Sequence, residues 1–127
     1  IAYAINVDGT KRMIEFAMSC IGLQRFHYIS TCYVSGRHVG DFKESDLVLG
    51  QTFNNYYEET KYFAEVEVQK AKAVGLPAII YRPGIVVGNS KTGATQKYDG
   101  PYYVIQFVMK SPKVAVLPKL GNPKIST

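Results

Sequence analysis

Residues 55–61 are Asn55-Tyr56-Tyr57-Glu58-Glu59-Thr60-Lys61, and they open a predicted helix. Tyr57 and Lys61 are four positions apart, so on a helix they share one face, with Cβ atoms about 5–6 Å apart. A phenol ordinarily keeps its proton at neutral pH, and a cation held beside it favours the phenolate. The pair therefore predicts a general acid/base. By itself the spacing is weak support, because a chain with 10 tyrosines and many lysines contains about one such pair by chance.

Two short apolar segments flank this helix and are predicted to be strands. Residues 25–30 and residues 78–82 are rich in aromatic and β-branched side chains, which is typical of buried strands. The helix between them is predicted over residues 53–74, and Gly75 and Pro77 end it. Strand, helix and strand at this spacing indicate a right-handed crossover between parallel strands.

The remaining segments extend the same alternation. Residues 1–21 predict a helix whose apolar face is formed by Ile5, Gly9, Met13, Ala17 and Cys20. Residues 37–52 and 89–100 are polar and contain glycines, so we expect loops there. A further helix is predicted over 101–109 and a short strand over 114–117. The sequence thus predicts an α/β fold with a parallel sheet.

Polar or rigid residues follow both predicted strands. Ser30-Thr31 comes after the first and Arg82-Pro83-Gly84 after the second. The carboxyl ends of parallel strands, and the start of the helix that joins them, lie at the edge where open α/β sheets bind ligands. Thr31, Tyr57 and the turn at Pro83 are therefore expected to converge there. Taken locally, Ser30-Thr31 also fits a plain polar strand end.

These motifs together resemble the extended short-chain dehydrogenase/reductase superfamily. The resemblance covers nearly the whole chain and is carried by four segments: Asn6-Val7-Asp8-Gly9-Thr10, Ser30-Thr31-Cys32-Tyr33-Val34-Ser35-Gly36, the Tyr57/Lys61 pair, and Arg82-Pro83-Gly84-Ile85-Val86-Val87-Gly88. Within the superfamily, Gly88-Asn89-Ser90-Lys91-Thr92-Gly93 resembles the thioester reductase and fatty acyl-CoA reductase branch, the "male sterility" type.

The resemblance implies a role for each matching residue. Tyr57 is then the proton donor or acceptor, and Lys61 favours its phenolate and binds the nicotinamide ribose. Thr31 hydrogen-bonds the substrate oxygen, and Asn6 supports a water relay toward Lys61. The expected contacts with NAD or NADP are made by Ser30, Tyr57, Lys61, Pro83, Gly84, Ile85 and Val86.

The resemblance also implies a Rossmann-like, doubly wound parallel sheet, of which residues 1–127 form the central to C-terminal part. Members carry a glycine-rich phosphate loop after their first strand, and this sequence has none. We therefore expect that a glycine-rich N-terminal part and a C-terminal substrate part of the NAD(P)-binding domain lie outside this chain. The residue that selects NAD or NADP belongs to the first of these parts.

Composition sets broad limits on partners and compartment. The net charge of +5 fits either a solvated basic surface or a site for a phosphorylated ligand. No predicted helix carries the stripe of Lys and Arg that would indicate nucleic-acid binding. Cys20 and Cys32 have no metal or redox spacing and lie among apolar residues, which favours a reducing, cytoplasmic location. No apolar run reaches the length of about 18 residues that a membrane span needs.

The predicted function is an NAD(P)-dependent oxidoreductase that transfers hydride between nicotinamide and a carbonyl or acyl carbon. The resemblance to the thioester reductase branch implies an acyl thioester as the substrate, and Lys91 and Lys97 in the 89–100 loop offer charges to its pantetheine phosphates. A solvated lysine loop explains those residues equally well. Alternatives are a sugar-nucleotide epimerase or dehydratase, a hydroxysteroid-type dehydrogenase, or a catalytically silent cofactor-sensing protein on the same fold.

Overall fold

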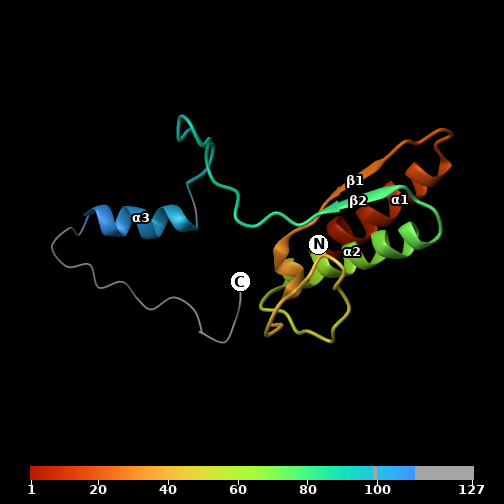
Figure 1. The fold of residues 1–127 in the computed structure, drawn as a ribbon, viewed down its shortest axis with the longest axis horizontal. Helices are drawn as coiled ribbons and strands as arrows, with labels where there is room; N and C mark the ends of the chain where they lie inside the picture. Colours follow the sequence, from red (N-terminus) through yellow and green to blue (C-terminus); the bar gives the residue numbers. More distant parts are fainter. Residues whose placement is uncertain (99, 111–127) are drawn as a thin grey trace. The chain divides into compact units, whose positions relative to one another are not determined.

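The computed structural model describes residues 1–98 and 100–110, which form two compact units that divide after Gly84 (Figure 1). The first unit, residues 1–84, holds a parallel sheet and the helices packed on it. The second unit begins at Ile85, and its described residues form a loop and a helix.

Strands β1 (Phe26–Ile29) and β2 (Ala78–Tyr81) form a parallel pair in which Phe26 lies opposite Ala78 and Ile29 opposite Tyr81. The hydrogen bonding continues past both strands: Ser30 N donates to Tyr81 O at 2.7 Å and Cys32 N donates to Pro83 O at 3.0 Å. The predicted strands, and their parallel pairing across one helix, are confirmed.

Helix α2 (Tyr56–Ala73) is the crossover between the two strands. Asn55 has an extended backbone and caps the helix, because its Oδ1 accepts from Glu58 N at 3.0 Å. Glu58 Oε2 in turn accepts from Asn54 N at 2.8 Å, so its carboxylate fixes the residue before the cap. The helix therefore starts three residues later than predicted, since the capping residues do not have helical dihedral angles.

The first helical segment consists of a π-helical turn, η1 (Ala4–Asp8), followed by α1 (Gly9–Ser19). Its predicted apolar face is partly wrong: Ile5 and Met13 are exposed, whereas Val7 and Ala17 are buried. Steps of four residues rotate about 40° further around a helix each time, so a stripe drawn in such steps drifts off the buried face. The π turn adds to this shift of phase.

The core of the first unit lies between the sheet and one layer of helices, in which α1 and α2 run side by side (Figure 1). Ala64 and Val68 of α2 are completely buried there, and Tyr28 of β1 packs against them. Ile29, next to Tyr28, is 60% exposed because strand residues alternate between the two faces. Within the described part of the chain, β1 is therefore buried on one face only.

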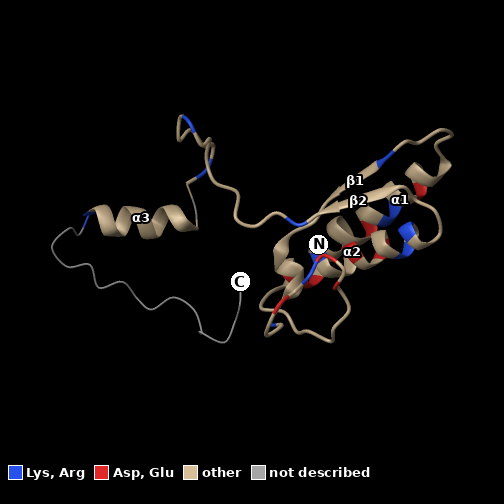
Figure 2. Ribbon diagram, viewed as in Figure 1, with Lys and Arg blue, Asp and Glu red and all other residues tan. Residues whose placement is uncertain are grey.

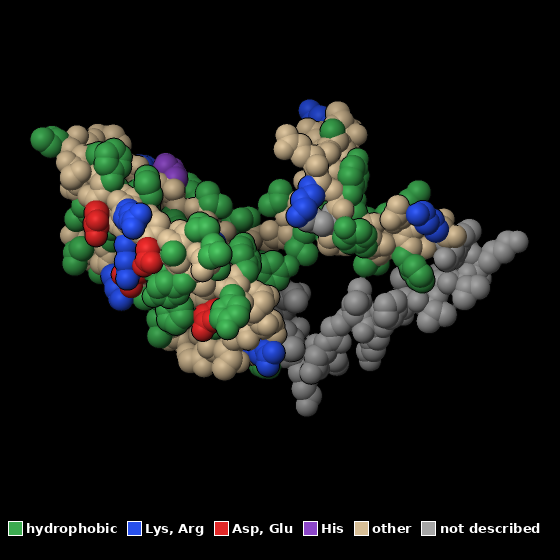
Figure 3. Space-filling model, turned by 180° about the vertical axis from the view of Figure 1, so that it is seen from behind, with side chains coloured by type: hydrophobic (Ala, Val, Ile, Leu, Met, Phe, Trp, Pro, Cys, Tyr) green, Lys and Arg blue, Asp and Glu red, His purple; other side chains and the backbone are tan. Residues whose placement is uncertain are grey.

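Charges of both signs are spread over α1 and α2 (Figure 2), and apolar side chains lie between them on the surface seen in Figure 3. Cys20 is half-buried and Cys32 is exposed, so Cys32 does not lie in the apolar surroundings expected for it. Neither α1, α2 nor any other helix within the described ranges is long and apolar enough to cross a membrane.

The second unit contains the predicted loop and helix α3 (Pro101–Lys110). Asn89 shapes the loop, because its Oδ1 accepts from Lys91 N at 2.8 Å and from Thr92 N at 3.0 Å. Gly88 N donates to the Tyr102 hydroxyl at 2.7 Å, which ties the start of the loop to α3. The strand predicted over 114–117 lies outside the described residues.

Candidate active site

The side chain of Lys61 hydrogen-bonds the last residue of β1. Its Nζ donates to Ile29 O at 2.8 Å and lies 5.0 Å from the centre of the Tyr28 ring. Tyr57 is one turn earlier on α2 and is 52% exposed, and no described residue hydrogen-bonds its hydroxyl. The phenol is therefore free to meet a ligand at the carboxyl end of β1.

Burial affects the charge of the groups around Lys61. It lowers the pKa of the Lys61 ammonium, and the carboxylate of Glu65 opposes that shift. Burial also raises the pKa of the Tyr28 phenol, which therefore stays neutral under the ammonium. The contact between Tyr28 and Lys61 is thus one between a cation and a neutral ring, which is attractive.

Asn6 lies in the π-helical turn and contacts α2. Its Nδ2 donates to Thr60 Oγ1 at 2.9 Å, and that hydroxyl donates to Tyr56 O at 2.7 Å. Asn6 is thus connected to the residue before Lys61 and not to Lys61 itself. Single π turns inside helices are frequent at functional sites, and the water relay assigned to Asn6 stays a prediction.

Ser30 and Thr31 follow β1 directly, and both are 4% exposed. Thr31 Oγ1 accepts weakly from Tyr33 N at 3.3 Å, as the cap of the short helix η2 (Cys32–Ser35). No described residue accepts the Thr31 hydroxyl hydrogen, so it can still be donated to a ligand. The backbone hydrogen bonds of Ser30 to Tyr81, the last residue of β2, and of Cys32 to Pro83 hold Thr31 from both sides.

Replacing Thr31 tests whether this hydroxyl binds a reacting oxygen. In the full-length protein, Thr31→Ser is expected to keep substantial turnover, whereas Thr31→Val should lose about 10²–10³-fold, the usual cost of removing one donor to a developing oxyanion. Steady-state kinetics, with thermal melting to check the fold, decide the matter. Equal turnover in the two variants would assign Thr31 a purely structural role.

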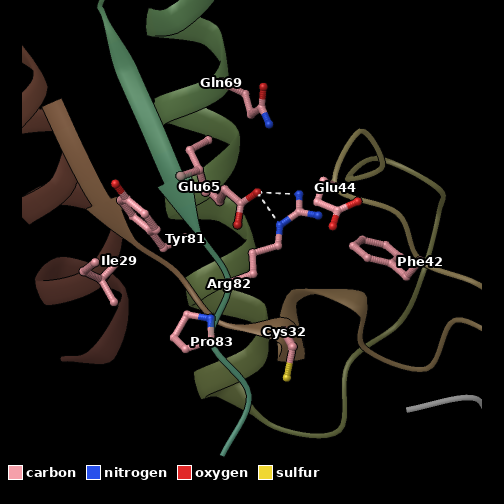
Figure 4. A pocket seen from close by; sticks show the side chains of 10 residues that line it. Ile29, Cys32, Phe42, Glu44, Glu65, Gln69, Tyr81, Arg82 and Pro83 are labelled. Atoms are coloured by element: carbon pink, nitrogen blue, oxygen red, sulfur yellow. Dashed lines mark hydrogen bonds and ion pairs between the residues drawn. The ribbon is translucent and has the colours of Figure 1, made fainter. Parts of the chain in front are cut away.

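One buried pair was not predicted from the sequence. Glu65 of α2 is completely buried, and Arg82, directly after β2, binds its Oε1 through Nη2 at 2.6 Å and Nε at 3.0 Å (Figure 4). Ser30 Oγ donates to the other carboxylate oxygen. A signal was present: a carboxylate between Ala64 and Val68 on the apolar face of a helix requires a buried partner.

A cavity of about 680 Å³ adjoins this pair. Its wall includes Glu65 and Gln69 of α2, Tyr81 at the end of β2, Arg82 and Pro83 directly after it, and Phe42 of the loop between η2 and α2 (Figure 4). Thr31, Tyr57 and Lys61 do not line it. The cavity therefore belongs to the Glu65 end of the site and is separate from the predicted acid/base pair.

The predicted nicotinamide contacts divide between the two units. Pro83 is half-buried, and its carbonyl accepts from Cys32 N. A Cβ added at Gly84 would meet no described atom within 4 Å, so packing does not require glycine at that position. Ile85 and Val86 are exposed and belong to the second unit. The cofactor contacts assigned to Ser30, Pro83, Gly84, Ile85 and Val86 stay predictions.

Comparison with known proteins supplies the family. The model of the NAD-binding family described as "Male sterility protein" matches residues 1–122. The chain belongs to this family. Its cofactor is therefore a nicotinamide dinucleotide, NAD or NADP, and the resemblance to the thioester reductase and fatty acyl-CoA reductase branch is confirmed.

Two similar proteins are named as an oxidoreductase and as a reductase. The NRPS-like oxidoreductase fscA of Fusarium equiseti is 31% identical over 103 residues, which are 76% of this chain and 9% of fscA. The fatty acyl-CoA reductase wat of Drosophila melanogaster is 32% identical over 126 residues, 80% of this chain and 24% of that protein. The chain thus spans less than a quarter of the length of each.

Solved structures of similar proteins confirm the Rossmann-like fold. The reductase domain of an aureusimine biosynthetic cluster matches with a TM-score of 0.61 and 28% identity. The match covers 70% of this chain and 24% of that reductase chain. The thiolation-reductase di-domain of an archaeal non-ribosomal peptide synthetase has a TM-score of 0.71 at 24% identity, over 87% of this chain and 32% of its own, and supports the fold alone.

Proposed function

We propose that the protein containing this chain reduces an acyl thioester with NADH or NADPH, and that Tyr57 supplies the proton. The observation that carries the proposal is the anchoring of Lys61 to Ile29 O at 2.8 Å, one helical turn from an unpartnered phenol. A buried hydroxyl at Thr31 lies on the same strand end. Relatives named as an oxidoreductase and as a fatty acyl-CoA reductase support the reaction class.

The residues present fit the nicotinamide end of the cofactor. Lys61 donates one of its three N–H groups to Ile29, so two remain for ribose hydroxyls. Gly84 leaves room for a planar group to approach the backbone, because no described atom fills the place of its missing Cβ. When bound, the reduced dinucleotide supplies a hydride to the acyl carbon.

The roles of the protein groups follow from the placement of their hydrogens. The Thr31 hydroxyl donates to the acyl oxygen and polarises the carbonyl, and the Tyr57 phenol places a proton on that oxygen as the acyl carbon gains the hydride. The carbon–sulfur bond then breaks, the oxygen returns its proton to Tyr57, and the leaving thiolate takes a proton from solvent, so the products are an aldehyde and a free thiol. Overall, one thioester, one reduced dinucleotide and one proton give one aldehyde, one thiol and one oxidised dinucleotide.

The substrate class is tested by stoichiometry. Given NADPH and a long-chain acyl-coenzyme A or an acyl-carrier-protein thioester, the full-length protein is expected to release one thiol for each reduced nicotinamide consumed. Thiol is measured with a chromogenic disulfide and the cofactor by its absorbance. Consumption of cofactor with simple ketones or sugar nucleotides, and none with thioesters, would assign the alternative dehydrogenase or epimerase function. Binding of the cofactor without turnover of any of these substrates would assign the silent, cofactor-sensing function.

The assignment of Lys91 and Lys97 to the phosphates of the pantetheine carrier stays a prediction. Lys91 is exposed, and the loop around it is fixed by Asn89. Reduction of coenzyme A thioesters should weaken as salt rises if these lysines bind phosphate, since exposed charges are screened. A short-chain thioester without phosphates serves as the comparison in the same assay.

A further inference from the structure

We propose that Glu65 and Arg82 are positioning residues for the reaction, and that they act on Thr31 through the side chain of Ser30. The Ser30–Glu65–Arg82 network joins three elements that the sequence separates: the turn after β1, the middle of α2 and the end of β2. The inference rests on the proposed function, because the hydroxyl that the network would position is the one assigned to the acyl oxygen.

Glu65 fixes the turn that carries Thr31. The carboxylate is completely buried, with one oxygen accepting from Ser30 Oγ and the other held by Arg82. The Ser30 hydroxyl hydrogen is therefore used inside the protein. Ser30 and Thr31 are adjacent, and the backbone hydrogen bonds on either side of Thr31 leave its side chain only a small range of movement.

Arg82 connects the same carboxylate to the loop between η2 and α2. Its Nη1 donates to Lys43 O at 3.1 Å and its Nη2 to Asp46 O at 2.7 Å, while its guanidinium lies 5.2 Å from the centre of the Phe42 ring. In Figure 4 the guanidinium lies between Glu65 and the loop that carries Phe42 and Glu44. One planar fork thus satisfies groups on α2 and on the loop, a geometry that lysine cannot reproduce.

The loop between η2 and α2 lies next to the candidate site in the chain. It runs from the short helix after Thr31 to the cap before Tyr57, so it joins the two groups that are proposed to contact the acyl oxygen. Gln51 supports the other end of the loop, with Nε2 donating to Val34 O at 2.9 Å and to Leu47 O at 2.7 Å. Arg82 therefore holds the loop that leaves η2 and, through Glu65 and Ser30, the turn that carries Thr31.

The test is a double-mutant cycle in the full-length protein. Ser30→Ala and Arg82→Lys are each made with Thr31 intact and with Thr31→Val, and turnover, KM, dinucleotide affinity and melting temperature are measured. With Thr31 intact, we expect each change to lower kcat about 10-fold or more, since small displacements of a catalytic group cost up to about 10²-fold. In the Thr31→Val background the same changes should alter kcat by less than about twofold, because coupled residues are non-additive.

Arg37→Ala is the matched control. Arg37 flanks the same loop and its Nε donates to Asn54 Oδ1 at 2.8 Å, but it is exposed and contacts neither Glu65 nor Ser30. Turnover in this variant is expected to match that of the unaltered protein. Ser30→Ala removes a single hydroxyl, so it gives a result even where Arg82→Lys is too unstable to assay.

The possible outcomes separate the two proposals. Equal losses of kcat in both Thr31 backgrounds, or losses that only follow the melting temperature, would overturn the positioning role and leave thioester reduction standing. Weakened dinucleotide binding by Ser30→Ala with unchanged kcat would also overturn it, in favour of a direct cofactor contact. Failure of the unaltered protein to reduce any thioester would overturn the proposed function and the positioning role with it.

Discussion

Tyr57→Phe in the full-length protein is expected to lower turnover by about 10²–10⁴-fold, the usual contribution of a general acid. The substitution removes the oxygen alone, and no described residue loses a hydrogen bond because none is made to that hydroxyl. Stability and dinucleotide affinity should therefore be nearly unchanged. Stopped-flow or steady-state reduction of the substrate, together with a binding titration by nicotinamide fluorescence, measures the two quantities separately.

Tyr56→Phe is the matched control for this experiment. Tyr56 occupies the preceding position of the same helix and is 78% exposed, so its loss of a hydroxyl is chemically identical. Helix geometry turns it about 100° away from Tyr57. If Tyr56→Phe and Tyr57→Phe had the same turnover, the proton would come from another group.

Lys61→Met is expected to reduce both turnover and cofactor affinity. The variant keeps an apolar stem of similar length but loses the ammonium that binds Ile29 O and lies over Tyr28. A charged hydrogen bond is worth about 1.5–3 kcal/mol, so the dissociation constant of the dinucleotide should rise roughly 10–100-fold. Turnover at saturating cofactor should fall as well, because the proposed reaction places the Lys61 ammonium between the nicotinamide ribose and the reacting phenol, and the variant lacks it.

The fold should tolerate this change. Burial already disfavours the charged form of Lys61, as its lowered pKa indicates, so an apolar side chain removes that cost. Lys70→Met, on the same helix, removes only an exposed pair with Glu67 and is the control. A Lys61→Met protein with undiminished cofactor affinity would contradict the ribose contact, and one with undiminished turnover would contradict the link to Tyr57.

Several features of the fold follow from interactions within a few residues, and the sequence predicts most of these. Gly75 and Pro77 stop α2 as predicted, because backbone restrictions act locally. The apolar segments before Ser30 and Arg82 form strands for the same reason. The cap formed by Asn55 and Glu58 is equally local but was not predicted, since the helix was expected to begin at residue 53. The parallel crossover places Thr31 and Pro83 at the same edge, where Cys32 N donates to Pro83 O, and the convergence of Tyr57 with them stays a prediction.

The sequence alone therefore determined the order of elements, the parallel pairing and the face shared by Tyr57 and Lys61. Only the tertiary structure decided which groups surround them. The partners of Lys61 lie about thirty residues earlier in the chain, Glu65 meets Ser30 and Arg82 from two other elements, and the π turn brings Val7 into the core. These contacts depend on how helices and strands pack after they form, where the burial of a charge requires a partner that no local pattern names.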